Sequence, residues 1–189
     1  MINVIGLCGY ATAGKDEAAR GLEPFGFQRV SFADPVRAAA LAIDPIVAYN
    51  VDHIPVSPVR LSDLVLAYGW EATKRNPEAR RALQKLGTEG GREIHGPDCW
   101  TRIGGSTARE ILAAGNRVAF TDCRFPNEVD LVRELGGIMV RVDRPGVGPV
   151  NSHVSDNLEI RHDALVVNDG TVEQLHARIR EVVANQASN

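Results

Sequence analysis

The sequence predicts an α/β fold with a mostly parallel five-stranded sheet, helices on both faces and a helical insertion. Three observations lead to this prediction. Short apolar runs alternate with amphipathic helical patterns, a glycine-rich turn follows the first run, and a long middle stretch has helical patterns without a strand. Such alternation is typical of parallel sheets, whose ligands bind at the carboxyl ends of the strands. The 189 residues suffice for one such core, so a single domain over residues 1–189 is expected.

The predicted elements of the sheet layers follow from short apolar runs and from helical periodicity. The first strand, helix and second strand are predicted at 3–8, 15–22 and 27–32. The remaining strands are predicted at 117–121, 138–142 and 164–167, and the remaining layer helices at 127–135 and 172–185. Functional side chains should therefore lie just after strands.

The middle of the chain is predicted to be a helical insertion over residues 35–115 that binds the substrate beside the sheet. Its helical patterns occur at 36–43, 61–68, 77–93 and 100–114. An irregular segment is expected over 47–63, because prolines 55 and 58 and mixed polarity interrupt any pattern there.

The composition disfavours several classes of protein. A net charge of −3 and a pI near 6.0 give no bulk attraction to a nucleic-acid backbone, so no nucleic-acid partner is expected. Cys8, Cys99 and Cys123 match no zinc or disulfide framework, which indicates a reducing compartment. The apolar stretch 2–8 is too short for a signal peptide or a membrane span, so we expect a cytoplasmic protein.

The turn after the first strand has the spacing of a phosphate-binding loop. Residues 9–15 read G-x-x-x-x-G-K, and they follow a predicted strand and open a helix, as the motif requires. Backbone N–H groups and the helix N-terminus would face the phosphates, while Lys15 would reach the β- and γ-phosphates. The residues expected to contact ATP here are Gly9, Ala11, Thr12, Ala13, Gly14, Lys15, Asp16 and Glu17.

Asp16 departs from the usual loop, which has a Ser or Thr hydroxyl on Mg²⁺ at this position. A carboxylate can also hold Mg²⁺, directly or through water. The alternative interpretation is a glycine-rich turn that only caps a helix, with Asp16 favourably placed near its N-terminus.

The chain resembles the bacteriophage-type deoxynucleoside monophosphate kinases, P-loop kinases whose loop carries G-K-D. Further segments of this sequence are similar to that family, in family order, and extend the resemblance over residues 4–175; they are Ser31–Arg37, Arg80–Glu89, Asp98–Trp100, Asp122–Glu128, Arg144–Gly146, His153 and Asn168–Gly170. Glu17 departs from the Thr expected after Gly-Lys-Asp, and the middle segment is shorter than in the longest members.

The resemblance implies a three-layer P-loop kinase fold that binds ATP and Mg²⁺. The implied reaction is transfer of the γ-phosphoryl group of ATP to a dNMP, giving dNDP and ADP. It further implies a short lid-like segment over 144–160 and contacts of Asn168 and Gly170 with the donor adenine. A plain turn is the alternative for Asn168–Gly170.

Four residues are expected to act at the transferred phosphate: Lys15, Asp16, Asp122 and Arg124. Asp122 follows the third predicted strand, where P-loop enzymes commonly place a carboxylate near Mg²⁺, so Asp16 and Asp122 are the predicted metal residues. Arg124 would hold phosphates between donor and acceptor. The alternatives are a helix-capping role for Asp122 and a surface ion pair for Arg124.

The dNMP is expected to bind mainly to the insertion. Arg81 is implied as a ligand of the acceptor phosphate, Gln84 as a contact of the base or sugar, and Trp100 as a stacking partner of the base. The full set of predicted dNMP residues is Asp34, Arg37, Arg81, Gln84, Gly87, Thr88, Trp100 and Arg124. Solvated side chains, a helix C-cap at Gly87 and a core position for Trp100 are the corresponding alternatives.

The sequence leaves two other functions open. A P-loop kinase could instead act on a hydroxyl, such as a hydroxymethylpyrimidine in DNA or dephospho-coenzyme A, with Asp34 or Asp122 as general base. An ATP-binding switch without an acceptor pocket is the non-enzymatic alternative. The preferred base and the oligomeric state, including a homodimer, are also left open, as is a phage origin with a host-cytoplasm location.

Overall fold

The computed structural model describes residues 2–50, 57–148 and 160–186. The chain divides into two compact units. We call residues 1–32 with 101–189 the sheet unit, and residues 33–100 the helical unit. Each unit has its own hydrophobic core.

The sheet unit contains a five-stranded sheet, as the sequence predicts. Its strands are β1 (Val4–Cys8), β2 (Phe27–Val30), β5 (Arg117–Phe120), β6 (Ile138–Asp143) and β7 (Ala164–Val167). Their order is β2-β5-β1-β6-β7, and every neighbouring pair is parallel. β1 therefore lies at the centre, and the loop that follows it opens at the carboxyl edge of the sheet.

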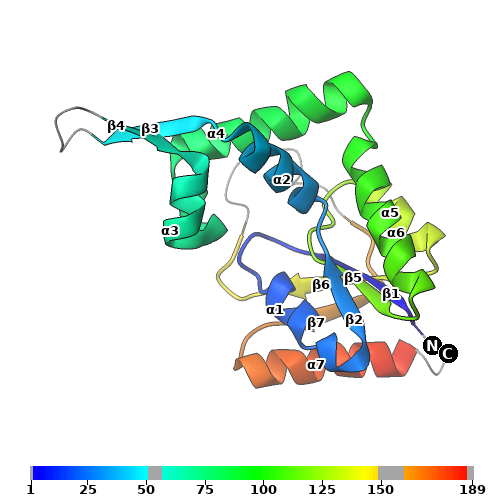
Figure 1. Cartoon of the computed structure of the whole chain (residues 1–189). Coiled ribbons are helices and arrows are strands. Elements are labelled where there is room, and N and C mark those ends of the chain that lie inside the picture. Colours follow the sequence, from blue (N-terminus) through cyan, green and yellow to red (C-terminus); the bar gives the residue numbers. More distant parts are fainter. Residues whose placement is uncertain (1, 51–56, 149–159, 187–189) are drawn as a thin grey trace. The chain divides into compact units, whose positions relative to one another are not determined.

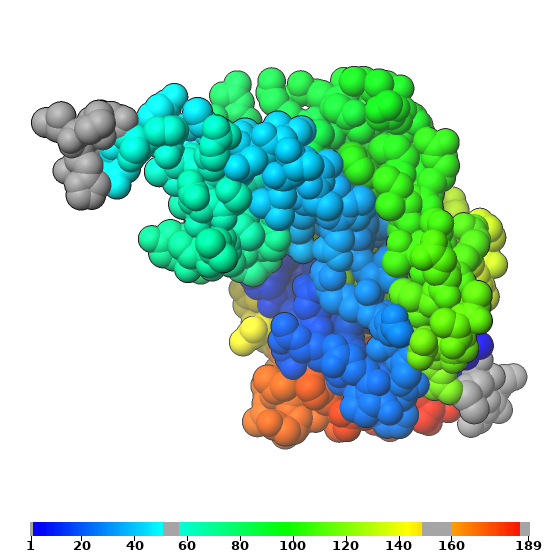
Figure 2. Space-filling view, in the orientation of Figure 1, coloured from blue at the N-terminus to red at the C-terminus, as the bar shows by residue number. Residues whose placement is uncertain are grey.

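Helices cover both faces of this sheet, which confirms the predicted α/β fold with its three layers (Figure 1). Helices α1 (Lys15–Arg20) and α7 (Val172–Gln186) pack on one face. Helices α5 (Cys99–Ala113) and α6 (Pro126–Glu134) pack on the other. In the space-filling view, the orange atoms of α7 lie directly against the blue atoms of the N-terminal part of the chain, which includes α1 (Figure 2). The guanidinium carbon of Arg180 in α7 lies 5.6 Å from the centre of the Phe25 ring.

The central strand is apolar throughout because both of its faces are buried. Successive side chains of a strand point to opposite faces, so Ile5 and Leu7 join the core beneath α1 and α7. Val4 and Cys8 join the core beneath α5 and α6. This packing fixes the register of β1 and with it the position of the loop that begins at Gly9.

The helical unit contains a β-hairpin that the sequence reading missed. Its elements are α2 (Ala33–Ile43), β3 (Ile46–Asn50), β4 (Ser57–Arg60), α3 (Leu61–Thr73), α4 (Pro77–Lys85) and the π-helix η2 (Leu86–Glu93). The prediction of an irregular segment over 47–63 was wrong, because β3 and β4 pair in antiparallel fashion. Pro58 is accommodated opposite Tyr49 because a two-stranded ribbon consists only of edge strands, where a missing N–H is tolerated.

The helical unit ends earlier than the predicted insertion. The insertion was expected to reach residue 115, but residues 101–113 of α5 belong to the sheet unit. Gly104 of α5 packs so closely on Phe32 that an added Cβ would lie 2.8 Å from its ring. Of the predicted lid over 144–160, residues 149–159, including His153, lie outside the described residues. No helix in the described ranges is long and apolar enough to cross a membrane.

Gly6 offers a direct test of this packing. A Cβ at Gly6 would lie 2.5 Å from the Met139 sulfur and 2.9 Å from a Val132 methyl carbon. We expect Gly6→Ala to lower the free energy of unfolding by about 1–3 kcal/mol, because overpacking displaces core side chains. Denaturant unfolding measures the change. Gly148→Ala, where an added Cβ meets nothing within 4 Å, is the control, and an equal loss in both variants would contradict the packing argument.

Candidate functional site

The phosphate loop between β1 and α1 adopts a conformation that depends on its glycines. Gly9 and Gly14 have φ values of 129° and 103°, and Thr12 also has a positive φ of 65°. At Gly9 an added Cβ would lie 2.2 Å from the Val142 carbonyl oxygen of β6. Both the left-handed backbone and the close approach exclude a side chain there. The loop is thus seated directly on the neighbouring strand.

Lys15 turns back into this loop. Its Nζ donates to the carbonyl oxygens of Gly9 at 2.8 Å and Tyr10 at 2.7 Å, and its side chain is buried. Burial, followed by the positive charge of Arg124, lowers the pKa of Lys15. The ammonium group is therefore held against the first two residues of the phosphate loop.

Asn168 braces the loop from the end of β7. Its Nδ2 donates to the Ala13 carbonyl oxygen at 2.9 Å, and its own backbone N–H donates to Asp143 at 2.7 Å. An added Cβ on Gly14 would lie 2.5 Å from this Nδ2. Contact of Asn168 with adenine stays a prediction, whereas its contact with the phosphate loop is direct. Gly170 packs on Gln174, whose Oε1 would lie 1.9 Å from an added Cβ.

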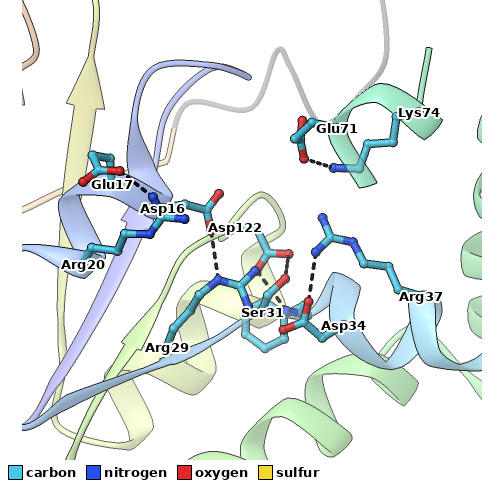
Figure 3. Close-up of polar contacts among 11 residues, drawn as sticks. Asp16, Glu17, Arg20, Arg29, Ser31, Asp34, Arg37, Glu71, Lys74 and Asp122 are labelled. Carbon is cyan, nitrogen blue, oxygen red and sulfur yellow. Dashed lines mark hydrogen bonds and ion pairs between the residues drawn. The ribbon is translucent and has the colours of Figure 1, made fainter. Parts of the chain in front are cut away.

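Asp16 is held by two donors at the start of α1. Arg29 Nε of β2 donates to Asp16 Oδ1 at 2.9 Å (Figure 3). Thr121 donates a second side-chain hydrogen bond to Asp16. Burial alone would raise the pKa of Asp16, but the hydrogen bond and charge of Arg29, the Thr121 bond and the charge of Lys15 lower it. Asp16 is thus an anion with a defined orientation, and its side chain is 63% exposed.

Asp122 is fixed by the segment that follows β2. The Ser31 hydroxyl donates to its Oδ2 at 2.7 Å, and the Phe32 backbone N–H donates to its Oδ1 at 2.9 Å (Figure 3). Both carboxylate oxygens are engaged, so the group cannot rotate freely. Its charge also acts on Lys15, which puts Asp122 beside the phosphate loop as expected from its position after a strand.

The loop between β5 and α6 carries Arg124. Glu128, which is buried, accepts from the backbone N–H of Arg124 at 2.6 Å and from that of Phe125 at 3.0 Å. Two donors on one Glu128 oxygen fix the turn that presents the exposed Arg124 side chain. The charge of Arg124 acts on Lys15. The sheet unit thus brings Lys15, Asp16, Asp122 and Arg124 together around one loop.

The Glu17 carboxylate contacts two side chains, Arg20 and His176. One carboxylate oxygen accepts from Arg20 at 2.7 Å, and the other lies 2.9 Å from His176 Nε2 of α7. Gly21 permits this contact, because an added Cβ would lie 2.8 Å from the His176 ring. The Glu17 side chain therefore joins α1 to α7, and its role in ATP binding stays a prediction.

In the helical unit, two of the predicted dNMP residues pair on the first turn of α2. Arg37 donates to Asp34 Oδ1 at 3.0 Å (Figure 3). Its guanidinium carbon lies 5.6 Å from the centre of a Trp70 ring. The Arg37 side chain is 20% exposed. An arginine that is partly desolvated and stacked on an indole keeps a defined direction, which suits a phosphate ligand.

Three further predicted dNMP residues, Arg81, Gln84 and Thr88, are exposed along α4 and η2. Arg81 lies 4.0 Å from Glu78, a distance at the limit of an ion pair. Gly87 packs on α2, where an added Cβ would lie 3.7 Å from Val36. The exposed face of α4 is compatible with a ligand and equally with solvent, so these roles stay predictions.

Trp100 braces the π-helix. Its Nε1–H donates to the Gly87 carbonyl oxygen at 2.8 Å. Gly91 makes room for the indole, since an added Cβ would lie 2.5 Å from it. Trp100 therefore contacts the segment that carries Gly87 and Thr88. Stacking of Trp100 on a base stays a prediction.

Sequence reasoning missed three residues that bind the predicted carboxylates. Arg29 and Thr121 hold Asp16, and Ser31 holds Asp122. Ser31 and Asp122 lie in segments that carry the family resemblance, so that pair had a signal in the sequence. The role of Arg29 had no signal in the sequence, because an arginine on an edge strand is usually a solvated surface residue.

Comparison with known families identifies the family of this chain. The sequence model described as "Deoxynucleotide monophosphate kinase" matches residues 66–179, which is more than half of the chain. The chain belongs to the deoxynucleotide monophosphate kinase family. It is accordingly an ATP-dependent phosphotransferase with a P-loop kinase fold, as its phosphate loop predicts.

Two viral relatives support this assignment. A protein of Acanthamoeba polyphaga mimivirus, to which this activity is provisionally assigned, is 29% identical over 96% of both chains. The deoxynucleotide monophosphate kinase of Escherichia phage RB69 is 24% identical over 55% of this chain and 44% of its own length. Among solved structures, the dephospho-CoA kinase from Campylobacter jejuni is 13% identical, covers 100% of this chain and 98% of its own, and has a TM-score of 0.48.

The bracing of the loop by Asn168 can be tested by Asn168→Ala. We expect a several-fold higher KM for ATP, because the loop loses a hydrogen bond worth about 1 kcal/mol to its ordered form. Steady-state kinetics measure the change. Asn127→Ala is the control, since Asn127 also donates a side-chain amide bond, to Thr101 at 3.0 Å, away from the loop. An unchanged KM for ATP in Asn168→Ala would contradict the bracing role.

Trp100→Phe separates the two roles of Trp100, because phenylalanine keeps an aromatic face but cannot donate to the Gly87 carbonyl oxygen. If bracing of the π-helix matters for the acceptor, the KM for the dNMP should rise several-fold while the KM for ATP stays the same. Kinetics with each substrate varied in turn measure both constants. Wild-type values for both would favour stacking over bracing.

Proposed function

We propose that the enzyme transfers the γ-phosphoryl group of ATP to the α-phosphate of a deoxynucleoside monophosphate, using Mg²⁺ and a site around Lys15. The observation that carries the proposal is the phosphate loop, with Lys15 hydrogen-bonded inside it. Membership of the deoxynucleotide monophosphate kinase family supplies the class of acceptor.

The phosphates of ATP would lie on the loop from Gly9 to Gly14 and on the N-terminus of α1. Backbone N–H groups at a helix N-terminus carry a partial positive charge that attracts anions. Lys15 would exchange its two loop carbonyl contacts for phosphate oxygens as the nucleotide enters.

The available donor set fits a magnesium ion. Mg²⁺ prefers oxygen ligands and is usually bound by one or two carboxylates together with substrate phosphates. Asp16 and Asp122 supply carboxylate oxygens next to Lys15. Within the described residues no group of three or more His, Cys, Asp or Glu side chains could hold a metal ion by itself. When bound, Mg²⁺ would neutralise part of the phosphate charge.

The acceptor requires positioning more than proton transfer. A monophosphate oxygen is already anionic near neutral pH, so the residues must align it and offset charge. Arg124 would hold the transferred group between donor and acceptor. Arg37 and Arg81 would hold the acceptor phosphate, with Gln84, Thr88 and the π-helix next to the nucleoside.

A coupled ADP-release assay tests the proposal. ATP, Mg²⁺ and each dNMP or NMP are supplied in turn, and turnover is expected with one or more dNMPs. Lys15→Ala should lower kcat/KM on the order of 100-fold or more, because a positive charge at the transferred phosphate is lost. Lys74→Ala is the matched control, since the Lys74 ammonium group pairs with Glu71 in the helical unit.

Background ADP release with every monophosphate, from enzyme that still binds ATP, would refute the proposed acceptor. Hydroxyl acceptors, including hydroxymethylated DNA, would then be tested in the same assay. Turnover in Lys15→Ala equal to that of the wild type would refute the proposed role of the loop.

A further inference from the structure

Two donors from one short segment hold the two carboxylates of the proposed metal site. Arg29 Nε donates to Asp16 Oδ1 at 2.9 Å, and the Ser31 hydroxyl donates to Asp122 Oδ2 at 2.7 Å. Figure 3 shows both side chains directed from this segment toward the carboxylates. The end of β2 therefore orders groups that belong to α1 and to the end of β5.

The Asp16 carboxylate needs such an arrangement more than a hydroxyl would. The usual loop has a Ser or Thr here, whose single oxygen lies close to the backbone. An aspartate has two oxygens on a longer side chain, and its side chain at this position is 63% exposed. Without a partner it would sample several rotamers.

The contacts that Asp16 makes leave room for a metal ion or its water. A carboxylate offers about four lone-pair sites. Arg29 and Thr121 donate to Asp16 in this structure. The planar guanidinium of Arg29 fixes the plane of the carboxylate more firmly than a point charge can. The remaining sites can then face the phosphate loop.

We propose that Arg29 is a positioning residue that holds the Asp16 carboxylate toward Mg²⁺·ATP in the phosphate loop. This inference rests on the proposed function, in which Asp16 binds the metal. Arg29 itself is not a ligand of metal or nucleotide, and it acts through Asp16. Folding depends little on the pair, because exposed ion pairs contribute only about 0–1 kcal/mol to stability.

The effect of Mg²⁺ on nucleotide affinity tests the proposal without turnover. Titration calorimetry with a non-hydrolysable ATP analogue, with and without Mg²⁺, gives the factor by which the metal tightens binding. We expect Arg29→Ala to reduce this factor by roughly 10-fold, the lower end of the usual effect of residues that orient metal ligands. Removal of a positive charge alone would favour Mg²⁺, so a reduced factor separates orientation from charge.

Asp16→Ala and the double variant complete the experiment. If Arg29 acts through Asp16, the factor should fall in Asp16→Ala, and Arg29→Ala should add nothing in that background. Arg109→Ala is the matched control, because Arg109 also forms an exposed ion pair in the sheet unit, with Glu134 at 2.8 Å. Melting temperatures of all variants should stay close to that of the wild type.

Three outcomes would overturn the inference. An unchanged or larger Mg²⁺ factor in Arg29→Ala, together with a loss in Asp16→Ala, would remove the positioning role and leave the proposed metal role of Asp16 intact. An additional loss in the double variant would mean that Arg29 contacts the nucleotide directly. An unchanged factor in Asp16→Ala would remove the metal role of Asp16 itself, whatever the dNMP assay shows.

Discussion

The seating of the phosphate loop on the strands beside β1 is the constraint on which the rest of the sheet unit depends. A loop whose N–H groups face a ligand cannot hold itself by ordinary ladder bonds. The loop is therefore held in place by contacts with neighbouring strands and with the core. Gly9 lies against the Val142 carbonyl, the Ala13 side chain is buried in the core, and its carbonyl oxygen accepts from Asn168.

The strand order explains why these neighbours are available. β1 lies between β5 and β6, so the segments after all three strands meet at one edge of the sheet. Asp122 follows β5, Asp143 ends β6, and the Asn168 backbone N–H donates to the Asp143 carbonyl oxygen. One parallel sheet with this order thus delivers a phosphate loop, a carboxylate and an amide brace from distant parts of the sequence.

The sequence predicts the sheet well because its physical signal is strong. A strand buried on both faces must be apolar throughout, as Val4–Cys8 is. Gly9 and Gly14 indicate a turn, because glycine readily adopts the positive φ values that other residues avoid. The hairpin at β3 and β4 gave a weak signal, because Pro58 and the polar neighbours of its short strands match an irregular segment equally well.

The orientation of side chains was the least predictable feature of the structure. Glu17 contacts His176 of α7, and the Trp100 N–H donates to the π-helix. The sequence could not show these directions, because the same residues at the same positions could equally contact a nucleotide.

The charges around the loop show how a chain with net charge −3 can bind a polyanion. Lys15, Arg29 and Arg124 stand beside Asp16 and Asp122, so the local balance is close to neutral even though two carboxylates are present. Replacing a hydroxyl by Asp16 adds a negative charge where phosphates must bind, and the Arg29 guanidinium offsets that charge at 2.9 Å. Arg29 pairs with this carboxylate, while the carbonyl oxygens of Gly9 and Tyr10 hold the Lys15 ammonium group in the phosphate loop. Under the proposed role of Asp16 in binding Mg²⁺, Arg29 and Thr121 lie outside the G-K-D motif but belong to the same functional unit as Lys15 and Asp16.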